Sequence, residues 1–191
     1  IGNNNKMKQG VCFDDVLLTP RYSDIKSRKE VDLTTSLPRI GDIKYPVVSS
    51  PMDTVTGTSM AVQMCAYGGL GIIHRYNAID EQASAVYAAK NAGSHVVGAA
   101  VGVSGDFLKR ARALAKSGAD VICVDIAHGH HVMMKEALLT LREDPYVGDL
   151  HLMAGNVATL EAFNDLADWG ADSIRVGIGG GSICSTRVQT G

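Results

Sequence analysis

Short runs of consecutive apolar residues alternate with helix-patterned segments from about residue 46 onward. The runs are rich in valine and isoleucine and are bounded by glycine or proline, so each predicts a buried β-strand. The segments between them repeat their apolar positions every three or four residues, as a helix packed on one face does. The predicted strands are Pro46–Ser50, Leu70–His74, Val96–Val103, Val121–Asp125, Leu150–Ala154 and Ser173–Val176. The predicted helices are Thr58–Tyr67, Asp80–Asn91, Asp106–Ser117, His131–Arg142 and Thr159–Trp169.

Residues 11–45 do not show this alternation. Pro20, Pro38 and Gly41 interrupt the segment, and such residues are typical of turns and loops. We expect an irregular entry segment here, in which Val31–Leu33 could form a strand.

Strands that are continuously apolar suit a parallel sheet covered by helices on its faces, and the alternation predicts an α/β fold. The phrase SGADVICVD at 117–125 returns as WGADSIRVG at 169–177, a weak internal repeat that favours a (β/α)8 TIM barrel over an open sheet. A complete barrel has eight strands, and the pattern supplies only about the first six. We therefore expect residues 1–191 to be a single catalytic-barrel domain that is incomplete at its C-terminus.

Composition excludes several classes of partner. The formal net charge is -2 and lysine and arginine form no run, so we expect no binding of nucleic acid. The first ten residues are polar and no later stretch reaches membrane-spanning length, so we expect no signal peptide, no membrane anchor and a cytoplasmic location. The four cysteines are widely separated, which suggests reduced thiols.

The clearest chemical signal follows the sixth predicted strand. In a (β/α) barrel the active site lies on the loops at the C-terminal ends of the strands. The loop GIGGGSICSTR at 177–187 contains four glycines within five residues and then Cys184. Glycines let the backbone approach a ligand closely, and a thiol on such a loop is accessible. The spacing alone leaves two interpretations open, a reactive nucleophile or a phosphate- or ion-binding turn beside a bystander cysteine.

Several phrases in order resemble one family of enzymes. They are FDDVLLTP at 13–20, SSPMDTVT at 49–56, GGLGIIHR at 68–75, VDIAHGH at 124–130, AGNVAT at 154–159 and the Cys184 loop. Together they are similar to the IMP dehydrogenase and GMP reductase family, from about Gly10 to Gly191. The resemblance implies covalent catalysis on a purine nucleotide (IMP, XMP or GMP) with NAD or NADPH.

The resemblance also implies a role for individual residues. Cys184 would be the nucleophile that adds to purine C2, and Thr186 would assist it. The nucleotide would be bound by Ser50, Met52, Arg175, Ser182 and Ile183. Asp125 and Asn156 would face the nicotinamide cofactor, with Arg175 nearby. The backbone carbonyls of Gly179, Gly181 and Cys184 would bind a monovalent cation, usually potassium.

The sequence departs from the family in three ways. Gly180 stands where proline is usual, which should raise the conformational entropy cost of ordering the loop by about 0.4–1 kcal/mol. Asn91–His95 joins the second helix directly to the third strand, so we expect no insertion of regulatory CBS modules. The C-terminal part that completes the nucleotide site in the family is absent, so we expect the fragment alone to be inactive. Family members usually form homotetramers, and we carry that expectation over.

Three functional interpretations remain. GGLGIIHR and VDIAHGH favour an IMP dehydrogenase, whereas the missing CBS modules and KSRKEVDL at 26–33 favour a GMP reductase. We expect the dehydrogenase. The alternative from another class is a truncated, non-catalytic barrel that acts as a binding or assembly partner.

The other cysteine, aspartate and histidine residues that could be functional also have structural interpretations. Cys12, Cys65 and Cys123 are expected to be packing residues, and Asp53 to cap a turn. His74 is either structural or functional. His128, His130 and His131 suggest a metal cluster, but neighbouring side chains diverge and no carboxylate lies at ligand spacing, so we do not expect one.

Overall fold

A computed structural model describes residues 10–11, 13–181 and 183–190 of the chain. Its main body is one parallel sheet of six strands in the order β3-β4-β5-β6-β7-β8. The strands are β3 (Val48–Ser49), β4 (Leu70–Ile73), β5 (Gly98–Val101), β6 (Val121–Asp125), β7 (His151–Val157) and β8 (Ser173–Val176). The helices are α1 (Thr58–Ala66), α2 (Ile79–Asn91), α3 (Phe107–Lys116), α4 (Val132–Glu143), α5 (Leu160–Asp168) and α6 (Thr186–Thr190).

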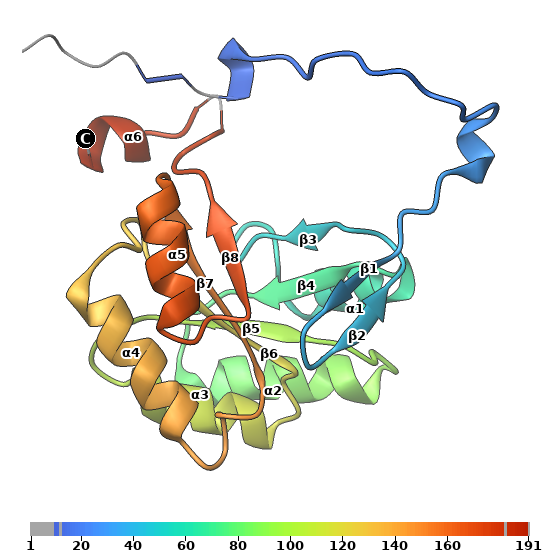
Figure 1. Cartoon of the computed structure of the whole chain (residues 1–191). Helices are drawn as coiled ribbons and strands as arrows, with labels where there is room; N and C mark the ends of the chain where they lie inside the picture. Colours follow the sequence, from blue (N-terminus) through green and yellow to red (C-terminus); the bar gives the residue numbers. More distant parts are fainter. Residues whose placement is uncertain (1–9, 12, 182, 191) are drawn as a thin grey trace, which may run out of the picture.

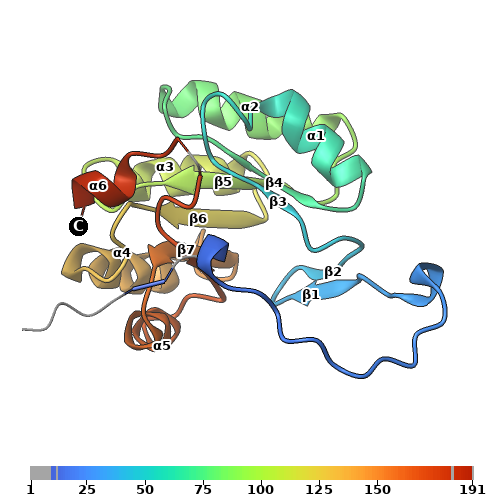
Figure 2. The same ribbon diagram turned by 90° about the horizontal axis from the view of Figure 1, so that it is seen from above.

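Each of α1 to α5 connects one strand of the sheet to the next, and these helices follow the outside of the curved sheet (Figures 1 and 2). This is a half-barrel of six βα units, and the predicted α/β class and parallel strands are confirmed. Residues 92–97 join α2 directly to β5, as the sequence predicted.

The strands are buried because helices cover the sheet and because their residues are apolar. Val121, Ile122, Cys123 and Val124 of β6 are all 0 % exposed. Burial of about 25 cal/mol per Å² of apolar surface makes these central strands the main source of stability. The outer strand β8 is only half-buried or exposed. The core therefore lies under β5 to β7, and the sheet edges are less protected.

The predicted strand at Val31–Leu33 is wrong. Val31 and Leu33 are 43 % and 49 % exposed, and the Asp32 carboxylate accepts a hydrogen bond from the Thr34 N–H at 2.9 Å, which bends the chain locally. The strands of this region are instead β1 (Thr35–Leu37) and β2 (Gly41–Ile43), paired antiparallel as a hairpin.

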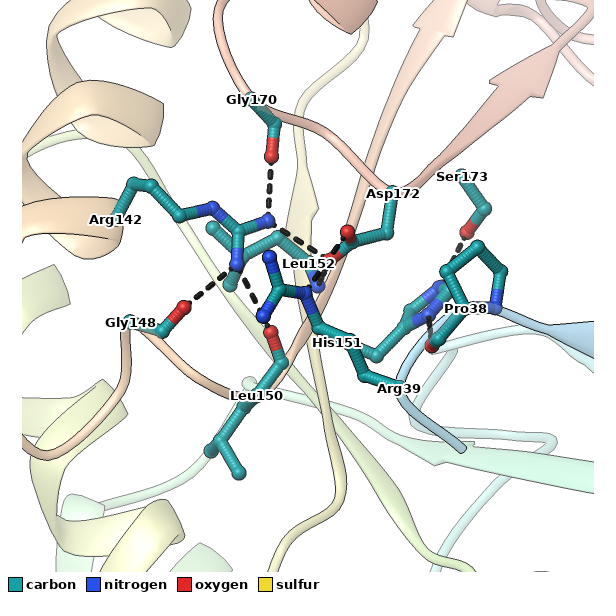
Figure 3. A network of polar contacts seen from close by, with 10 residues as sticks. All are labelled: Pro38, Arg39, Arg142, Gly148, Leu150, His151, Leu152, Gly170, Asp172 and Ser173. Atoms are coloured by element: carbon teal, nitrogen blue, oxygen red, sulfur yellow. Dashed lines mark hydrogen bonds and ion pairs between the residues drawn. The ribbon is translucent and has the colours of Figure 1, made fainter. Parts of the chain in front are cut away.

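The β1–β2 hairpin lies against the end of the sheet where β7 and β8 begin (Figure 3). The ring of His151, which is fully buried, is 2.7 Å from the Pro38 carbonyl oxygen and 2.7 Å from the Ser173 hydroxyl. Asp172 binds Arg39 of the hairpin at 3.0 Å and Arg142 of α4 at 2.7 Å. These contacts cover the end of the half-barrel opposite the Cys184 loop.

Residues 16–34 form a long arm that runs away from the body before the chain reaches the hairpin (Figure 1). Leu17, Leu18 and Tyr22 on this arm are each 96 % exposed. Among the described residues, no helix combines the length and the apolar character that crossing a membrane requires.

Candidate active site

The Cys184 loop follows β8 and turns back on itself. Gly179 has φ +60°, and a Cβ added there would lie 3.1 Å from the Arg187 backbone nitrogen and 3.3 Å from the Thr186 Cβ. The Cys184 N–H donates to the Gly181 carbonyl oxygen at 3.0 Å. Glycine is needed at 179 because a side chain would be strained by the positive φ and crowded by the returning chain.

The Cys184 thiol is exposed, and its Sγ lies 3.2 Å from the Thr186 Oγ1. Hydrogen bonds from the Thr186 side chain and from its backbone N–H hold the pKa of Cys184 below the ordinary value for a thiol, and the positive charge of Arg187 acts in the same direction. A lowered pKa increases the thiolate, which is the nucleophilic form. The predicted catalytic pair is therefore in contact.

The other cysteines that the structure describes are buried. Burial raises the pKa of the Cys123 thiol to about 12, which keeps it protonated. Cys65 is also buried, and its Sγ lies 3.1 Å from the His95 Nδ1. The expectation that Cys65 and Cys123 are packing residues is confirmed, whereas Cys12 lies outside the described residues.

A charged group lies at the C-terminal ends of β6 and β8. Asp125 forms an ion pair with Arg175, and neither side chain is more than 26 % exposed. Arg175 Nη1 is also 3.9 Å from the Cys123 Sγ, and Arg75 Nη2 donates to the Asp125 carbonyl oxygen at 3.4 Å. Sequence reasoning did not assign a role to Arg75, although its position directly after a strand is a signal.

Asn156 joins this group to the Cys184 loop. Its side-chain amide donates to the Gly177 carbonyl oxygen at 2.7 Å, and its own carbonyl oxygen accepts from the Gly129 N–H at 2.7 Å. Asn156 thus connects the ends of three strands, β6, β7 and β8.

The remaining predicted nucleotide residues are less constrained. The Ser50 carbonyl oxygen accepts from the Met52 N–H at 2.8 Å and from the Thr56 hydroxyl at 2.6 Å, so the loop after β3 forms a tight turn. Met52 is 51 % exposed and Ile183 is 99 % exposed. Ser182 lies outside the described residues. Buried Thr56, which the sequence analysis did not single out, holds this turn.

Two other residues have structural partners. The Asp53 carboxylate accepts from the Thr54 N–H at 2.9 Å, which is a local contact within its own turn, and its role as a cap stays a prediction. The His74 Nδ1 accepts from the Tyr76 N–H at 3.2 Å, which is a structural contact.

A pocket of about 690 Å³ lies between the N-terminal residues and the first half of the Cys184 loop. Of the predicted site residues that the structure describes, none lines it. The lining residues are Gly10, Val11, Asp14, Asp15, Val16, Ala158, Val176, Gly177, Ile178, Gly180 and Arg187. Gly177 and Gly180 of the Cys184 loop line this pocket, whereas the Cys184 thiol itself is exposed.

The carbonyl oxygens of Gly179, Gly181 and Cys184 come from one tight turn. Gly181 O already accepts from the Cys184 N–H, and a carbonyl oxygen has a second lone pair for another partner. Carbonyl oxygens are hard donors that suit an alkali cation. Among the described residues, no group of three or more histidine, cysteine, aspartate or glutamate side chains could bind a metal ion. The donor set of this turn fits potassium better than a transition metal.

Comparison with known proteins gives consistent matches. Residues 10–191 match the family model of the IMP dehydrogenase / GMP reductase domain. The chain is 32 % identical to inosine-5'-monophosphate dehydrogenase of Nitrosopumilus maritimus, covering 97 % of this chain and 64 % of that protein. It is 36 % identical to the enzyme of the same name from Cryptosporidium parvum, over 96 % of this chain and 55 % of that one.

Reductases match as well. GMP reductase of Leishmania donovani is 27 % identical over 100 % of this chain and 66 % of its own length. The crystal structure of GMP reductase from Trypanosoma brucei in complex with guanosine 5'-triphosphate superimposes with a TM-score of 0.87 at 25 % identity, covering 96 % of this chain and 74 % of that one. The chain spans 55–66 % of the length of these curated relatives.

Proposed function

Because the chain belongs to the IMP dehydrogenase / GMP reductase family, we propose that the whole protein is a purine-nucleotide oxidoreductase, specifically an IMP dehydrogenase. The observation that carries the proposal is the exposed Cys184 thiol, whose pKa is lowered by Thr186 at the turn of a glycine-rich loop. The dehydrogenase is favoured because GGLGIIHR and VDIAHGH are more similar to that branch of the family.

In this proposal the Cys184 thiolate adds to C2 of IMP and forms a covalent bond, which divides a difficult substitution into two steps. The hydride that leaves C2 would pass to a bound nicotinamide cofactor, which would supply the oxidising power. Water then attacks the resulting thioimidate, the bond from C2 to Sγ breaks, and XMP leaves while Cys184 is regenerated. The Thr186 hydroxyl, in contact with Sγ, stabilises the thiolate at the start and end of the cycle.

Ser50, Met52, Arg175, Ser182 and Ile183 would bind the nucleotide, and Asp125 and Asn156 would face the nicotinamide. The proposal is supported by the ion pair of Asp125 with Arg175 and by the hydrogen bond of Asn156 to Gly177, which fix these side chains near the Cys184 loop. Potassium at the carbonyl oxygens of Gly179, Gly181 and Cys184, a homotetramer and a cytoplasmic location belong to the same proposal.

The second candidate is a GMP reductase, in which NADPH supplies hydride and ammonia leaves from C2. It is favoured by the TM-score of 0.87 to the Trypanosoma brucei reductase. Related structures of that reductase are described in complex with guanosine 5'-triphosphate and with guanosine 5'-monophosphate.

The deciding experiment supplies the full-length protein in parallel with IMP plus NAD and with GMP plus NADPH, and follows the absorbance of reduced nicotinamide. We expect the absorbance to rise with IMP, and Cys184→Ala to abolish the rise. Cys65→Ala removes a thiol remote from the loop and serves as the matched control.

A fall in absorbance with GMP would establish the reductase instead. No turnover of either pair by the folded protein would exclude both enzymes and support the non-catalytic interpretation.

A further inference from the structure

The loop between β6 and α4, residues 126–131, is hydrogen-bonded to the backbone around Asn156. The Ile126 N–H donates to the Gly155 carbonyl oxygen at 2.9 Å, and the Asn156 N–H donates to the Ile126 carbonyl oxygen at 2.9 Å. The Gly129 N–H donates to the Asn156 carbonyl oxygen at 2.7 Å. The packing is close, because a Cβ on Gly129 would lie 2.8 Å from that oxygen.

These hydrogen bonds therefore fix the backbone position of Asn156, and with it the position from which the Asn156 side chain extends. Because that side chain donates to the Gly177 carbonyl oxygen, a displacement of residues 126–131 would be passed on to the first residue of the Cys184 loop. The contacts form a continuous path from the β6–α4 loop through Asn156 to the candidate active site.

One side chain of this loop is held from outside the barrel. His130 Nε2 lies 2.8 Å from Asp165 Oδ2 of α5, and it must donate because a carboxylate only accepts. The His130 ring is also stacked on Trp169, with ring centroids 6.0 Å apart, and the Lys135 ammonium lies 5.8 Å from the centre of the Trp169 ring.

The His130 contact is separate from the start of helix α4. That role belongs to His131, whose Nδ1 accepts from the Met133 N–H at 3.2 Å. The side chains of His130 and Asp165 are 30 % and 41 % exposed, and a polar contact this exposed adds little to global stability. The pair is thus better suited to fixing the position of a loop than to stabilising the fold.

We propose that His130 and Asp165 are positioning residues, which hold the β6–α4 loop against α5 and so place Asn156 for the nicotinamide cofactor. The inference rests on the proposed function, because it assumes that Asn156 faces that cofactor. His130 touches neither Cys184 nor a substrate atom in this scheme, and it acts through the backbone of Gly129.

The test compares His130→Ala with His130→Gln, whose side-chain amide can still donate to Asp165. Asp168→Ala removes a carboxylate from the exposed face of the same helix and is the matched control. We expect His130→Ala to speed amide hydrogen exchange at Gly129 by about tenfold and to raise the KM for the nicotinamide cofactor by about three- to tenfold. The KM for the purine nucleotide should rise less, because the displacement reaches the Cys184 loop only through the Gly177 carbonyl oxygen, and His130→Gln should restore the exchange rate and both KM values.

Trp169 is the only tryptophan in the chain, so its fluorescence reports on the same contact. Acrylamide should quench it more strongly in His130→Ala and equally in Asp168→Ala and the parent. Unchanged Gly129 exchange in His130→Ala, or equal effects of Asp168→Ala, would overturn the proposal. A parent protein that is inactive with both nucleotide pairs would refute the proposed function. Hydrogen exchange and fluorescence quenching do not require turnover, so these two measurements would still decide whether His130 and Asp165 hold the loop in position.

Discussion

The pKa of the Cys184 thiol is set mainly by the groups that contact its sulfur atom. Its lowered pKa depends first on the hydrogen bond from the Thr186 side chain and then on the Thr186 N–H. The thiol is exposed on a loop rather than enclosed in a dry pocket. Thr186 is therefore the main partner that lowers the pKa of this thiol, and a substitution there should change its reactivity.

Thr186→Val keeps the shape of the side chain and its backbone N–H but removes the hydroxyl. We expect the pKa of Cys184 to rise toward the ordinary value, so the thiolate fraction at neutral pH falls. The rate of alkylation by iodoacetamide, measured from pH 6 to 10, should move to higher pH and drop by about threefold to tenfold at pH 7.

Val188→Thr, an isosteric substitution at an exposed position of the same short helix, should leave the alkylation profile in place. Identical profiles for Thr186→Val and the parent would mean that the Thr186 hydroxyl does not control the thiol.

At the scale of residues, the sequence identified candidate residues but not all of their contacts, and the catalytic roles of Cys184 and Thr186 stay a prediction. The order of motifs singled out Cys184 and Thr186, and the structure brings them together. The partner of His130 could not be read from the sequence, because Asp165 is 35 positions away and meets it only when α5 packs beside α4. The same is true of Thr56, whose role depends on the turn at Ser50.

The attachment of the β1–β2 hairpin depends in part on the charge of Asp172. Burial alone would raise the pKa of Asp172, but hydrogen bonds from the Leu152 N–H and from Arg142 and Arg39 outweigh it, so this pKa lies below the ordinary value. The carboxylate therefore contributes stability above the pKa that it has in the unfolded chain. That contribution is lost as the pH falls through the lowered pKa of the folded state.

Asp172→Asn should lower the free energy of unfolding at pH 7 by about 2–4 kcal/mol, because it leaves Arg142 and Arg39 without their carboxylate. Urea unfolding at pH 7 and at steps from pH 5 to pH 2 checks this. The parent should lose stability faster than the variant in the acid range. Asp168→Asn, at an exposed position, is the control, and parallel acid profiles of parent and Asp172→Asn would contradict the assignment.

Elements were predicted well where burial determines them and poorly where it does not. Val121–Asp125 matches β6, because a buried run of branched apolar residues has few alternatives. Ser173–Val176 matches β8, although that strand is only half-buried or exposed. Val31–Leu33 and Thr35–Leu37 are equally short and equally mixed in composition. Only Thr35–Leu37 has a partner strand, which is Gly41–Ile43 across the turn at Pro38. The local pattern of residues does not predict that pairing.

The whole sheet has two outer strands. Within the part of the chain that the structure describes, β3 and β8 each have one neighbour, so the main-chain groups on their outer sides are unpaired. Such edges promote association between chains. The count of six strands was accessible from the sequence, because each apolar run is separate. The prediction that the sheet curves into part of a barrel rested on the family resemblance and the weak repeat, because no single segment indicates curvature.

We expect the 191-residue chain to self-associate through β8. Val176 on this strand is 54 % exposed, and Val176→Lys should reduce the associated fraction because edge lysines oppose strand pairing. Light scattering over a series of protein concentrations measures it. Val188→Lys changes a more exposed valine in α6 and should have little effect, and equal effects of the two substitutions would mean that association does not use the β8 edge.

The attachment of the hairpin also has a consequence for biosynthesis. Arg39 and Asp172 are separated by 133 positions, so a ribosome at about 5–20 residues per second makes Asp172 roughly seven to twenty-seven seconds after Arg39. During that interval the Arg39–Asp172 ion pair cannot form, whereas Leu37 and Ile40 can already pack against earlier core residues such as Leu70 and Ile72. The Arg39–Asp172 contact can therefore form only after the nascent chain has been made up to the residue that precedes β8.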